Sequence, residues 1–362
     1  MLASLGVGGA EKQVLALATR IAGRGHTVTL VTLLPQTQEE WPTTLPVFRL
    51  NLHKSPLSLV AALSRARRIL RELQPDIVHS HSYHANIVAR LVSPFAGKPI
   101  VISTIHNVYE GGSLRMLAYR LTDNLCAHTT AVSHAAADRF IRLKVIRAEK
   151  CSVIPNAIDL SEFTPDATRR NILRETLSAG DKFVWLAAGR ITAAKDYPNL
   201  ISAFARILKV KPNTFLWIAG QGREEEKVQL RTVASELNIK TQIKWLGLRR
   251  DLPSLLDAAD GFVSSSAWEG MPLAIAEAMA MQKPVVATNV GGVGELIGGA
   301  ESLAPARNPA ALASAMLELM RKPLAERLAV GRAARSRIQD NFNIEARIAD
   351  WEKLYGSLSP PA

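Results

Sequence analysis

Short apolar runs alternate with stretches of helical periodicity along most of the chain, an order typical of parallel sheets covered by helices. The run PIVISTI (99–105) belongs to the series in the first half, and FVWLAAG (183–189) opens an equivalent series in the second. Two such series predict the α/β class, with two doubly wound, Rossmann-like domains. The length of 362 residues suits two domains.

The individual elements follow from the same alternation. The predicted strands occupy 26–34, 76–81, 99–105, 128–133, 151–156, 183–189, 214–220, 243–247, 261–266 and 284–289. The predicted helices occupy 10–23, 57–73, 113–125, 134–142, 198–210, 224–237, 272–281, 309–320 and 343–357. Ligands in doubly wound sheets bind at the carboxyl ends of the strands, so we expect a ligand cleft between the two domains.

The boundary between the domains is predicted near 157–170, where Pro165 and polar residues interrupt the periodicity. We therefore expect a first domain over 1–165, a second over 166–342, and a last helix within 343–362 that crosses back to the first. Only MLASL precedes the GVGG loop of the first domain. The first strand is thus predicted to be short or missing, and a missing strand would leave ladder groups unpaired.

The composition excludes several classes of protein. Hydrophobic residues make up 48%, which excludes a mainly disordered chain. No stretch of about 18 uncharged apolar residues is present and the start lacks a signal-peptide pattern, so we expect a cytosolic chain. The net charge of +12 has three interpretations: a solvated surface, an anionic membrane surface, or nucleic acid. No nucleic-acid motif accompanies the charge, so we expect no nucleic-acid partner.

The strongest chemical motif is SSSAWEGMPLAIAEAMA (264–280), in which a strand, a loop and a helix follow one another. Pro272 stands where the helix would begin, and a helix start can hold a phosphate through its free N–H groups. Glu269 lies just before the helix, and Glu277 lies five residues after Pro272, or about 7.5 Å along the helix axis. Two carboxylates on either side of an anion site suit a nucleotide diphosphate sugar. The alternative is a capping Glu269 and a solvated Glu277.

The second motif is LAAGRITAAKDYPNLISAF (186–204), which places two cations at a strand end. Arg190 follows the strand directly and Lys195 comes five residues later, before a helix. A guanidinium fork and an ammonium can together neutralise a diphosphate. The alternative is a pair of exposed loop cations.

These segments, with GVGGAEKQV, TIHN and PNAID, resemble the retaining glycosyltransferases of family 4, which have the GT-B fold. The resemblance runs from Gly6 to about 354 and implies roles for several residues. Glu277 would bind ribose, Arg190 and Lys195 would clamp the diphosphate, and His106 would touch the donor sugar. Gly8 and Gly9 would let the first loop approach the phosphate closely. The donor sugar and diphosphate would also be held by Glu269 and by the backbone of Gly270, Met271, Pro272 and Leu273.

Other interpretations of these residues remain open. Gly8 and Gly9 could form an ordinary turn, and His106 could be a core histidine. The HSHSYH run (79–84) suggests a metal site, but no cysteine or acidic partner completes a zinc set, so we expect no metal. The chain has no complete GxGxxG, which disfavours a dinucleotide dehydrogenase.

The sequence therefore predicts a retaining glycosyltransferase that moves a sugar from a nucleotide sugar, expected to be UDP-linked, to a glycan or polyprenyl-linked acceptor in surface polysaccharide or lipopolysaccharide synthesis. Metal-independent transfer is expected because no Asp-x-Asp motif is present and the two cations can serve instead. The basic side of helix 57–73 suggests a peripheral position on the inner membrane face. Two alternatives stand: an inactive nucleotide-sugar-binding protein of this fold, and a GT-B nucleotide-sugar epimerase.

Overall fold

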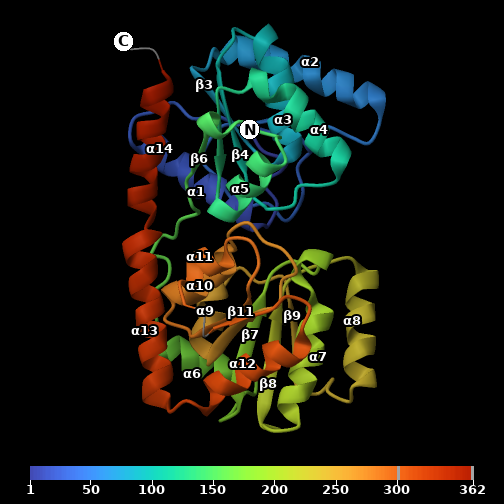
Figure 1. Ribbon diagram of the computed structural model, residues 1–362, viewed down its shortest axis with the longest axis vertical. Coiled ribbons are helices and arrows are strands. Elements are labelled where there is room, and N and C mark those ends of the chain that lie inside the picture. Colours follow the sequence, from blue (N-terminus) through green and yellow to red (C-terminus); the bar gives the residue numbers. More distant parts are fainter. Residues whose placement is uncertain (300–301, 360–362) are drawn as a thin grey trace. The chain divides into compact units, whose positions relative to one another are not determined.

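The computed structural model describes residues 1–299 and 302–359. They form two compact units (Figure 1): unit 1 contains Met1–Asn156 and the chain from Glu345 onward, and unit 2 contains Ala157–Ile344. The division thus falls nine residues before the predicted one. Ile158 pairs with Asn343, and Phe163 is buried with its carbonyl accepting from Arg335, so 157–165 packs with unit 2.

Unit 1 contains a four-stranded parallel sheet and a separate parallel pair. The sheet has the order β3-β4-β5-β6. Its strands are β3 (Ile77–His81), β4 (Ile100–Ile105), β5 (His128–Ala131) and β6 (Cys151–Val153). The pair consists of β1 (Leu30–Thr32) and β2 (Val47–Arg49). These strands are short and largely buried, as parallel strands covered on both faces should be.

Residues 1–3 join the two sheets of unit 1. Leu2 forms a parallel bridge with Thr32, and its N–H donates to the Val31 carbonyl at 3.0 Å. On the other side, the His81 N–H donates to the Met1 carbonyl at 2.9 Å. The first strand is therefore short and not missing, and the backbone groups of β1 and β3 that a missing strand would have exposed are paired.

The helices of unit 1 are α1 (Gly9–Gly23), α2 (Pro56–Leu73), α3 (Tyr83–Val92), α4 (Ser113–Thr122), α5 (His134–Arg142) and α14 (Ile344–Leu358), with short 3₁₀ turns at 93–95, 123–125 and 148–150. The start of α2 shows why they form: Ser55 caps the Ser58 N–H, and proline takes the first position. The last helix, α14, buries Ile348 and Trp351, and its Glu352 forms an ion pair at 2.7 Å with Arg24, the C-cap of α1.

Unit 2 is built on a six-stranded parallel sheet of order β12-β11-β10-β7-β8-β9. Its strands are β7 (Phe183–Ala188), β8 (Thr214–Ala219), β9 (Ile243–Gly247), β10 (Gly261–Ser264), β11 (Val285–Thr288) and β12 (Leu303–Ala304). Alternate residues such as Trp185 and Ala187 pack into one core with α7, α8 and α12. With the sheet of unit 1, this confirms the predicted α/β class and two doubly wound sheets.

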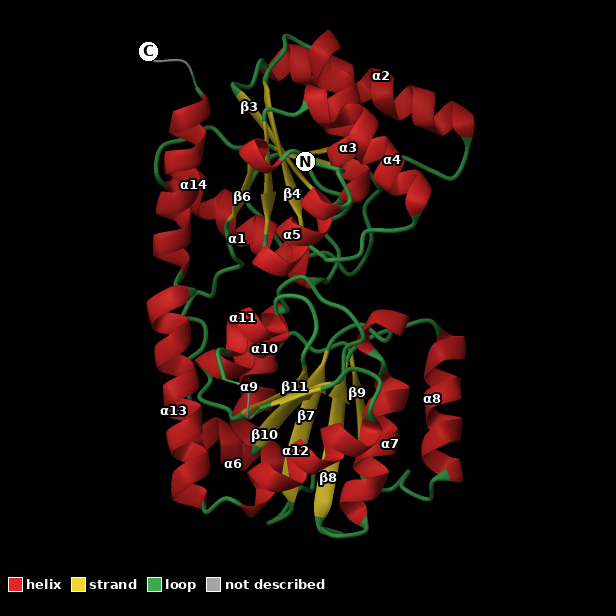
Figure 2. Ribbon diagram, in the orientation of Figure 1, coloured by secondary structure: helices red, strands yellow, loops and turns green. Residues whose placement is uncertain are grey.

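Helices cover both faces of this sheet (Figure 2). They are α6 (Ala167–Thr176), α7 (Tyr197–Leu208), α8 (Glu224–Glu236), α9 (Leu252–Ala258), α10 (Leu273–Ala280), α11 (Val293–Ile297), α12 (Pro309–Arg321) and α13 (Leu324–Asn341). Helix α13 lies very close to the end of α10: a Cβ at Gly331 would come within 2.0 Å of the Gln282 carbonyl oxygen. Only glycine permits that approach.

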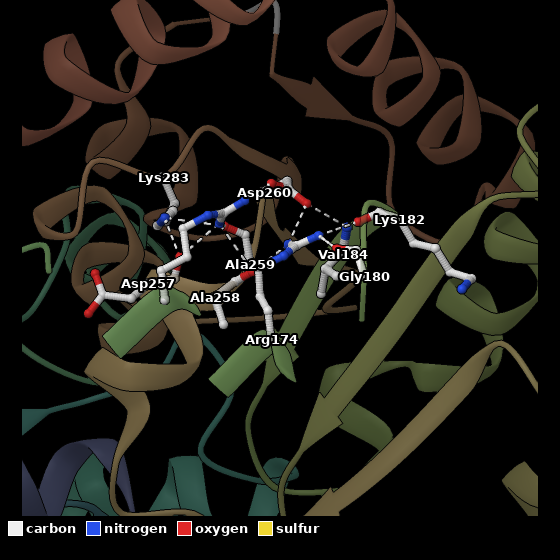
Figure 3. A network of polar contacts seen from close by, with 10 residues as sticks. Arg174, Gly180, Lys182, Val184, Asp257, Ala258, Ala259, Asp260 and Lys283 are labelled. Carbon is white, nitrogen blue, oxygen red and sulfur yellow. Dashed lines mark hydrogen bonds and ion pairs between the residues drawn. The ribbon is translucent and has the colours of Figure 1, made fainter. Parts of the chain in front are cut away.

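A polar network ties α6 to the amino-terminal edge of this sheet (Figure 3). Arg174 donates to Asp260 at 3.1 Å and to the carbonyls of Gly180 and Lys182, while the Val184 N–H donates to Asp260 at 2.9 Å. Arg170 also donates to Asp260, at 2.6 Å. Asp260 thus satisfies two arginines and a strand N–H at once, and its removal would leave all three without that acceptor.

We predict that Asp260→Ala lowers the free energy of unfolding of unit 2 by about 2–4 kcal/mol, because partly buried donors lose a charged acceptor. Denaturant titration followed by tryptophan fluorescence measures this, since Trp185 and Trp217 are buried in unit 2. The control is Asp181→Ala, an exposed acid in the neighbouring turn. Equal effects of the two substitutions would contradict the structural role of Asp260.

Candidate functional site

The strand order of unit 2 reverses between β7 and β10, and ligands of doubly wound sheets bind outside the carboxyl ends of strands at such a point. From β7 the chain moves outward to β8 and β9, then returns to β10 and moves the other way. The loop after β7 carries Arg190 and Lys195, and the loop after β10 carries Glu269. The fold thus places both sequence motifs at this switch point.

Lys195 and Glu269 form an ion pair across the two loops. Lys195 Nζ lies 2.6 Å from Glu269 Oε1, and the same oxygen accepts from the Ser266 hydroxyl at 2.7 Å. Only 22% of the lysine side chain and 9% of the glutamate side chain are exposed. The sequence predicted separate tasks for these residues; in this structure they hold each other in place.

Backbone contacts fix the loops that carry this pair. The Ala267 N–H donates to the Ala194 carbonyl, and the Ser265 hydroxyl donates to the Lys195 carbonyl, both at 2.8 Å. The Lys195 side chain passes over Gly189, where a Cβ would lie 2.9 Å from Cε. Gly189 has φ +151°, which glycine adopts readily. Contacts within the protein itself therefore fix the position of the ammonium group.

The start of α10 lies beside the pair. Pro272 is the N-cap and its own side chain makes no cap hydrogen bond, and the helix begins at Leu273. Its first N–H groups are thus available to an anion at the positive end of the helix dipole. The Gly270 carbonyl accepts from the Gly292 N–H at 2.8 Å, which fixes the turn before the helix. Met271 is buried.

The structure contradicts the alternative reading of the two glutamates. Glu277 is only 5% exposed, so it does not lie on a solvated face. Glu269 accepts from Lys195 and Ser266, and α10 has no side-chain cap hydrogen bond. Arg190 follows β7 and is exposed, as the loop-cation alternative also expects.

In unit 1, His106 follows β4 and takes part in a chain of rings. Its Nε2 lies 3.1 Å from Nδ1 of His81, and the rings of His81 and His79 are 4.0 Å apart. His79 reaches the Tyr355 hydroxyl of α14 at 2.8 Å and the Thr104 hydroxyl at 2.7 Å. In the described part of the chain, no three His, Cys, Asp or Glu residues are placed to hold a metal ion.

Burial keeps these imidazoles neutral. It lowers the pKa of His106 to about 4 and those of His79 and His81 well below the usual range. His106 Nδ1 is buried and has no hydrogen-bond partner in the described residues. His81 and His106 line one small cavity together with Gln13 of α1 and Asn156. One ring nitrogen of His106 is therefore left unsatisfied by the described residues, in a residue that lines this cavity.

Sequence reasoning missed Glu110, which anchors the His106 loop. Its carboxylate accepts from the His106 N–H at 3.1 Å and from the Tyr119 hydroxyl at 2.6 Å. Burial raises its pKa to about 7. Nothing in the local sequence signals this role, because the fold alone brings Tyr119 of α4 to the loop. Gly8 is the N-cap of α1 and Gly9 its first residue, so the N-cap position of α1 carries no side chain.

Comparison with known proteins identifies the family. The model of glycosyl transferases group 1 matches residues 168–337, and that of glycosyltransferase family 4 matches residues 7–162. Between them the two models match most of the chain. The chain belongs to the group 1 glycosyltransferases.

Relatives of this glycosyltransferase include two named enzymes. The Escherichia coli UDP-Gal:alpha-D-GlcNAc-diphosphoundecaprenol alpha-1,3-galactosyltransferase is 30% identical over 235 residues, which are 62% of this chain and 60% of that protein. Glycogen synthase of Mycobacterium tuberculosis is 27% identical, covering 96% of this chain and 89% of that protein. The chain thus spans less than two thirds of the length of the galactosyltransferase.

A solved structure shares the GT-B fold of this glycosyltransferase. It is Anabaena Alr3699/HepE in complex with UDP-glucose, with a TM-score of 0.87, 22% identity and 98% of both chains covered. At that identity the likeness shows the fold alone.

We predict that acid destabilises unit 1 of this glycosyltransferase through its buried histidines. Their pKa values lie below 6.5 in the folded chain and near 6.5 in the unfolded chain, so protons bind the unfolded state as pH falls from about 6.5 towards 4. The free energy of unfolding then falls over this range. Glu110, with its raised pKa, takes up a proton on folding between about pH 7 and 4.5 and offsets part of the loss.

The substitution His81→Gln should make the unfolding free energy depend less steeply on pH. It removes one histidine that stays neutral in the folded chain, so the difference in bound protons between the unfolded and folded states falls by about one. Hydrogen exchange of the β3 and β4 amides at pH 7, 6 and 5 measures the change within unit 1. His53→Gln, at an exposed position, serves as control. If the dependence of the unfolding free energy on pH is unchanged in the His81 variant, His81 does not contribute to the loss of stability in acid.

Proposed function

We propose that this protein transfers a sugar from a UDP-sugar to a glycan or lipid-linked acceptor, with retention of anomeric configuration and without a divalent ion. The observation that carries the proposal is the preorganised Lys195–Glu269 pair beside the uncapped start of α10. Family membership supports the reaction class. UDP is supported by the galactosyltransferase, whose name specifies UDP-Gal, and by the HepE complex with UDP-glucose.

Donor binding follows from the charges at the carboxyl edge of the unit 2 sheet. Arg190 and Lys195 supply positive charge, and the α10 N-terminus supplies N–H groups, so the diphosphate would lie between them. Glu277, a buried residue four positions after the start of α10, would accept hydrogen bonds from the ribose hydroxyls. The backbone of Met271, Pro272 and Leu273 would contact the donor sugar.

The chemical step breaks the bond between the anomeric carbon and the diphosphate oxygen. The leaving diphosphate keeps the electron pair, so negative charge grows on its oxygen while the sugar ring becomes positive. Fixed cations and helix N–H groups stabilise the growing negative charge, and Lys195 needs little reorganisation because Glu269 already holds it. This is the task that a divalent ion performs in other transferases.

The acceptor hydroxyl then forms the new bond on the face that the diphosphate leaves. Its proton passes to the leaving phosphate oxygen, so the step balances without a protein nucleophile. Neutral His106 can donate or accept one hydrogen bond near the sugar without placing a competing positive charge there. This assignment rests on the family resemblance of TIHN and on the lowered pKa of His106.

We predict that Lys195→Ala and Arg190→Ala each lower the transfer rate by about 10²–10³, the usual effect of removing one preorganised donor. Release of UDP from a panel of UDP-sugars, with and without polyprenyl-linked sugar acceptors, measures the rate. Lys209→Ala and Arg206→Ala remove exposed cations of unit 2 and should leave the rate unchanged. Wild-type turnover in both test variants would refute the diphosphate clamp, and no UDP release by the wild type would favour the inactive binding protein.

A different result is expected for Glu277→Ala, because the ribose interaction is made in the ground state and the transition state alike. The dissociation constant for UDP should rise by about tenfold or more while kcat changes little. Calorimetric titration with UDP and steady-state kinetics separate the two effects. An unchanged UDP affinity would remove Glu277 from the ribose site.

A membrane-facing surface is the second part of the proposal. Three leucines of α4, spaced by three and four residues, are exposed: Leu114 by 81%, Leu117 by 50% and Leu121 by 72%. Arg115 and Arg120 lie on the same helix. An apolar stripe beside arginines suits the interface of an anionic bilayer. No helix in the described residues is long and apolar enough to cross a membrane.

The sequence pointed instead to helix 57–73, which corresponds to α2 (Pro56–Leu73). On α2, Leu70 is buried and packs into the core of unit 1, whereas Leu59 and Val60 are exposed by 44% and 64%. The apolar side chains of α2 are therefore divided between core and surface. The continuous stripe lies on α4.

We predict that the protein sediments with vesicles containing anionic lipid at low salt. The double substitution Leu114→Ser/Leu121→Ser should reduce binding by at least about tenfold, because it removes apolar area that would enter the interface. The matched control is Leu328→Ser, at an exposed leucine of α13. Absence of lipid-dependent sedimentation by the wild type would refute membrane association and leave the solvated-surface interpretation of the charge.

A further inference from the structure

A cavity of about 750 Å³ lies in unit 2 beside the donor site. It is formed by the first turns of α7 and α8, the loop after β10 and the start of α12. Figure 1 shows α7 and α8 next to each other, and buried residues of both helices belong to the same hydrophobic core. The residues that matter for its chemistry are Asp196, Asn199, Glu226, Gln229, Trp268 and Arg307.

Asn199 is the unusual member of this wall. The residue is only 6% exposed, and within the described residues neither its side-chain nitrogen nor its side-chain oxygen has a hydrogen-bond partner. A buried amide left in that state costs about as much as a lost hydrogen bond, so native structures rarely keep one without a reason. Asn199 belongs to the wall of the cavity, so a ligand toward which its side chain turns would supply the acceptor and the donor that the amide lacks.

The polar groups of the wall select the ligand class. Carboxylates and amides accept from and donate to hydroxyl groups, and an indole ring offers an apolar face. Two carboxylates, Asp196 and Glu226, face the single cation Arg307, and Glu226 is already paired with Arg223 at 2.9 Å. With Arg223 counted, two cations balance the two carboxylates, and a wall without net charge suits a neutral polyol better than a phosphate.

We propose that this cavity binds a neutral saccharide at a site separate from the donor site. Among the residues that line it, none is a residue predicted to hold the donor. The two sites nevertheless share backbone, since Thr192 and Asp196 flank Lys195, and Trp268 directly precedes Glu269. A bound saccharide therefore contacts the loops that carry the ion pair, which gives the two sites a physical route for coupling.

The test is direct binding by titration calorimetry and ligand-observed NMR, with glucose, N-acetylglucosamine, maltose and lactose as probes and no nucleotide present. We expect the wild type to bind at least one probe with a dissociation constant on the order of 1 mM or tighter. Asn199→Leu and Gln229→Ala should each weaken that binding by about tenfold or more. Asn213→Ala changes an exposed amide before β8, at the opposite edge of the sheet, and should bind as the wild type does.

A stability measurement separates a ligand-binding amide from a structural one. If Asn199 lacks a partner in the free protein, Asn199→Leu should raise the Tm by about 2–4 °C, since an apolar group of similar size suits the burial. A lower Tm would show that the amide has a structural partner and would overturn the proposal. Gln229 is exposed, so its variant tests the site without this risk.

Two further results would also overturn the proposal. One is that none of the four probes binds. The other is that Arg190→Ala abolishes saccharide binding, because the probe would then occupy the donor site. The proposed transferase activity can fail without affecting any of these outcomes, since they report binding and stability and require no turnover.

Discussion

The Lys195–Glu269 ion pair is the interaction on which the account of this molecule depends. Taking two charges out of water is costly, and the cost is offset only where the geometry is good and the remaining polar groups are satisfied. Here one carboxylate oxygen accepts from both Lys195 and Ser266, at 2.6 and 2.7 Å. Removing either charge would leave the other buried and alone. The pair therefore constrains both loops that meet at the switch point of the sheet.

The two edges of the unit 2 sheet have different roles. At the amino-terminal edge, Arg170 and Arg174 bind Asp260 and fix α6 to the strands. At the carboxyl-terminal edge the small residues Gly189 and Gly220 let the loops approach closely: a Cβ at Gly220 would lie 1.9 Å from the Gly189 carbonyl oxygen. The amino-terminal edge thus stabilises the unit. At the carboxyl-terminal edge, glycines replace larger side chains, so that backbone and charged groups can lie close together. Such division is expected where rigidity must support a binding site.

Much of the fold could be predicted because buried parallel strands are short and continuously apolar. Strand β9 and helix α5 were predicted with the observed bounds. The short strands β2 and β12 were missed, since two or three residues give too little pattern. Helix α13 was missed because its apolar residues do not gather on one side, and α6 because it buries no residue and is held by its arginines.

The candidate site was predictable only where the residues lie close together in sequence. The motif around Glu269 and Glu277 was found in this way, as were Arg190 and Lys195. The pairing of Lys195 with Glu269 was not, because 74 residues separate them and only the strand order makes β7 and β10 neighbours. Glu110 and Tyr355 acquire their places through contacts with other elements. Their own segments carry no pattern that would reveal this.

The central claim is that fixed cations, and not a divalent ion, hold the nucleotide diphosphate. Calorimetric titration of UDP into the protein, in the presence of EDTA and then of Mg²⁺, tests it most directly. We expect the same dissociation constant in both conditions and a large loss of affinity when Arg190 and Lys195 are both replaced by alanine. UDP binding that requires Mg²⁺, or that is unaffected by loss of both cations, would contradict the claim.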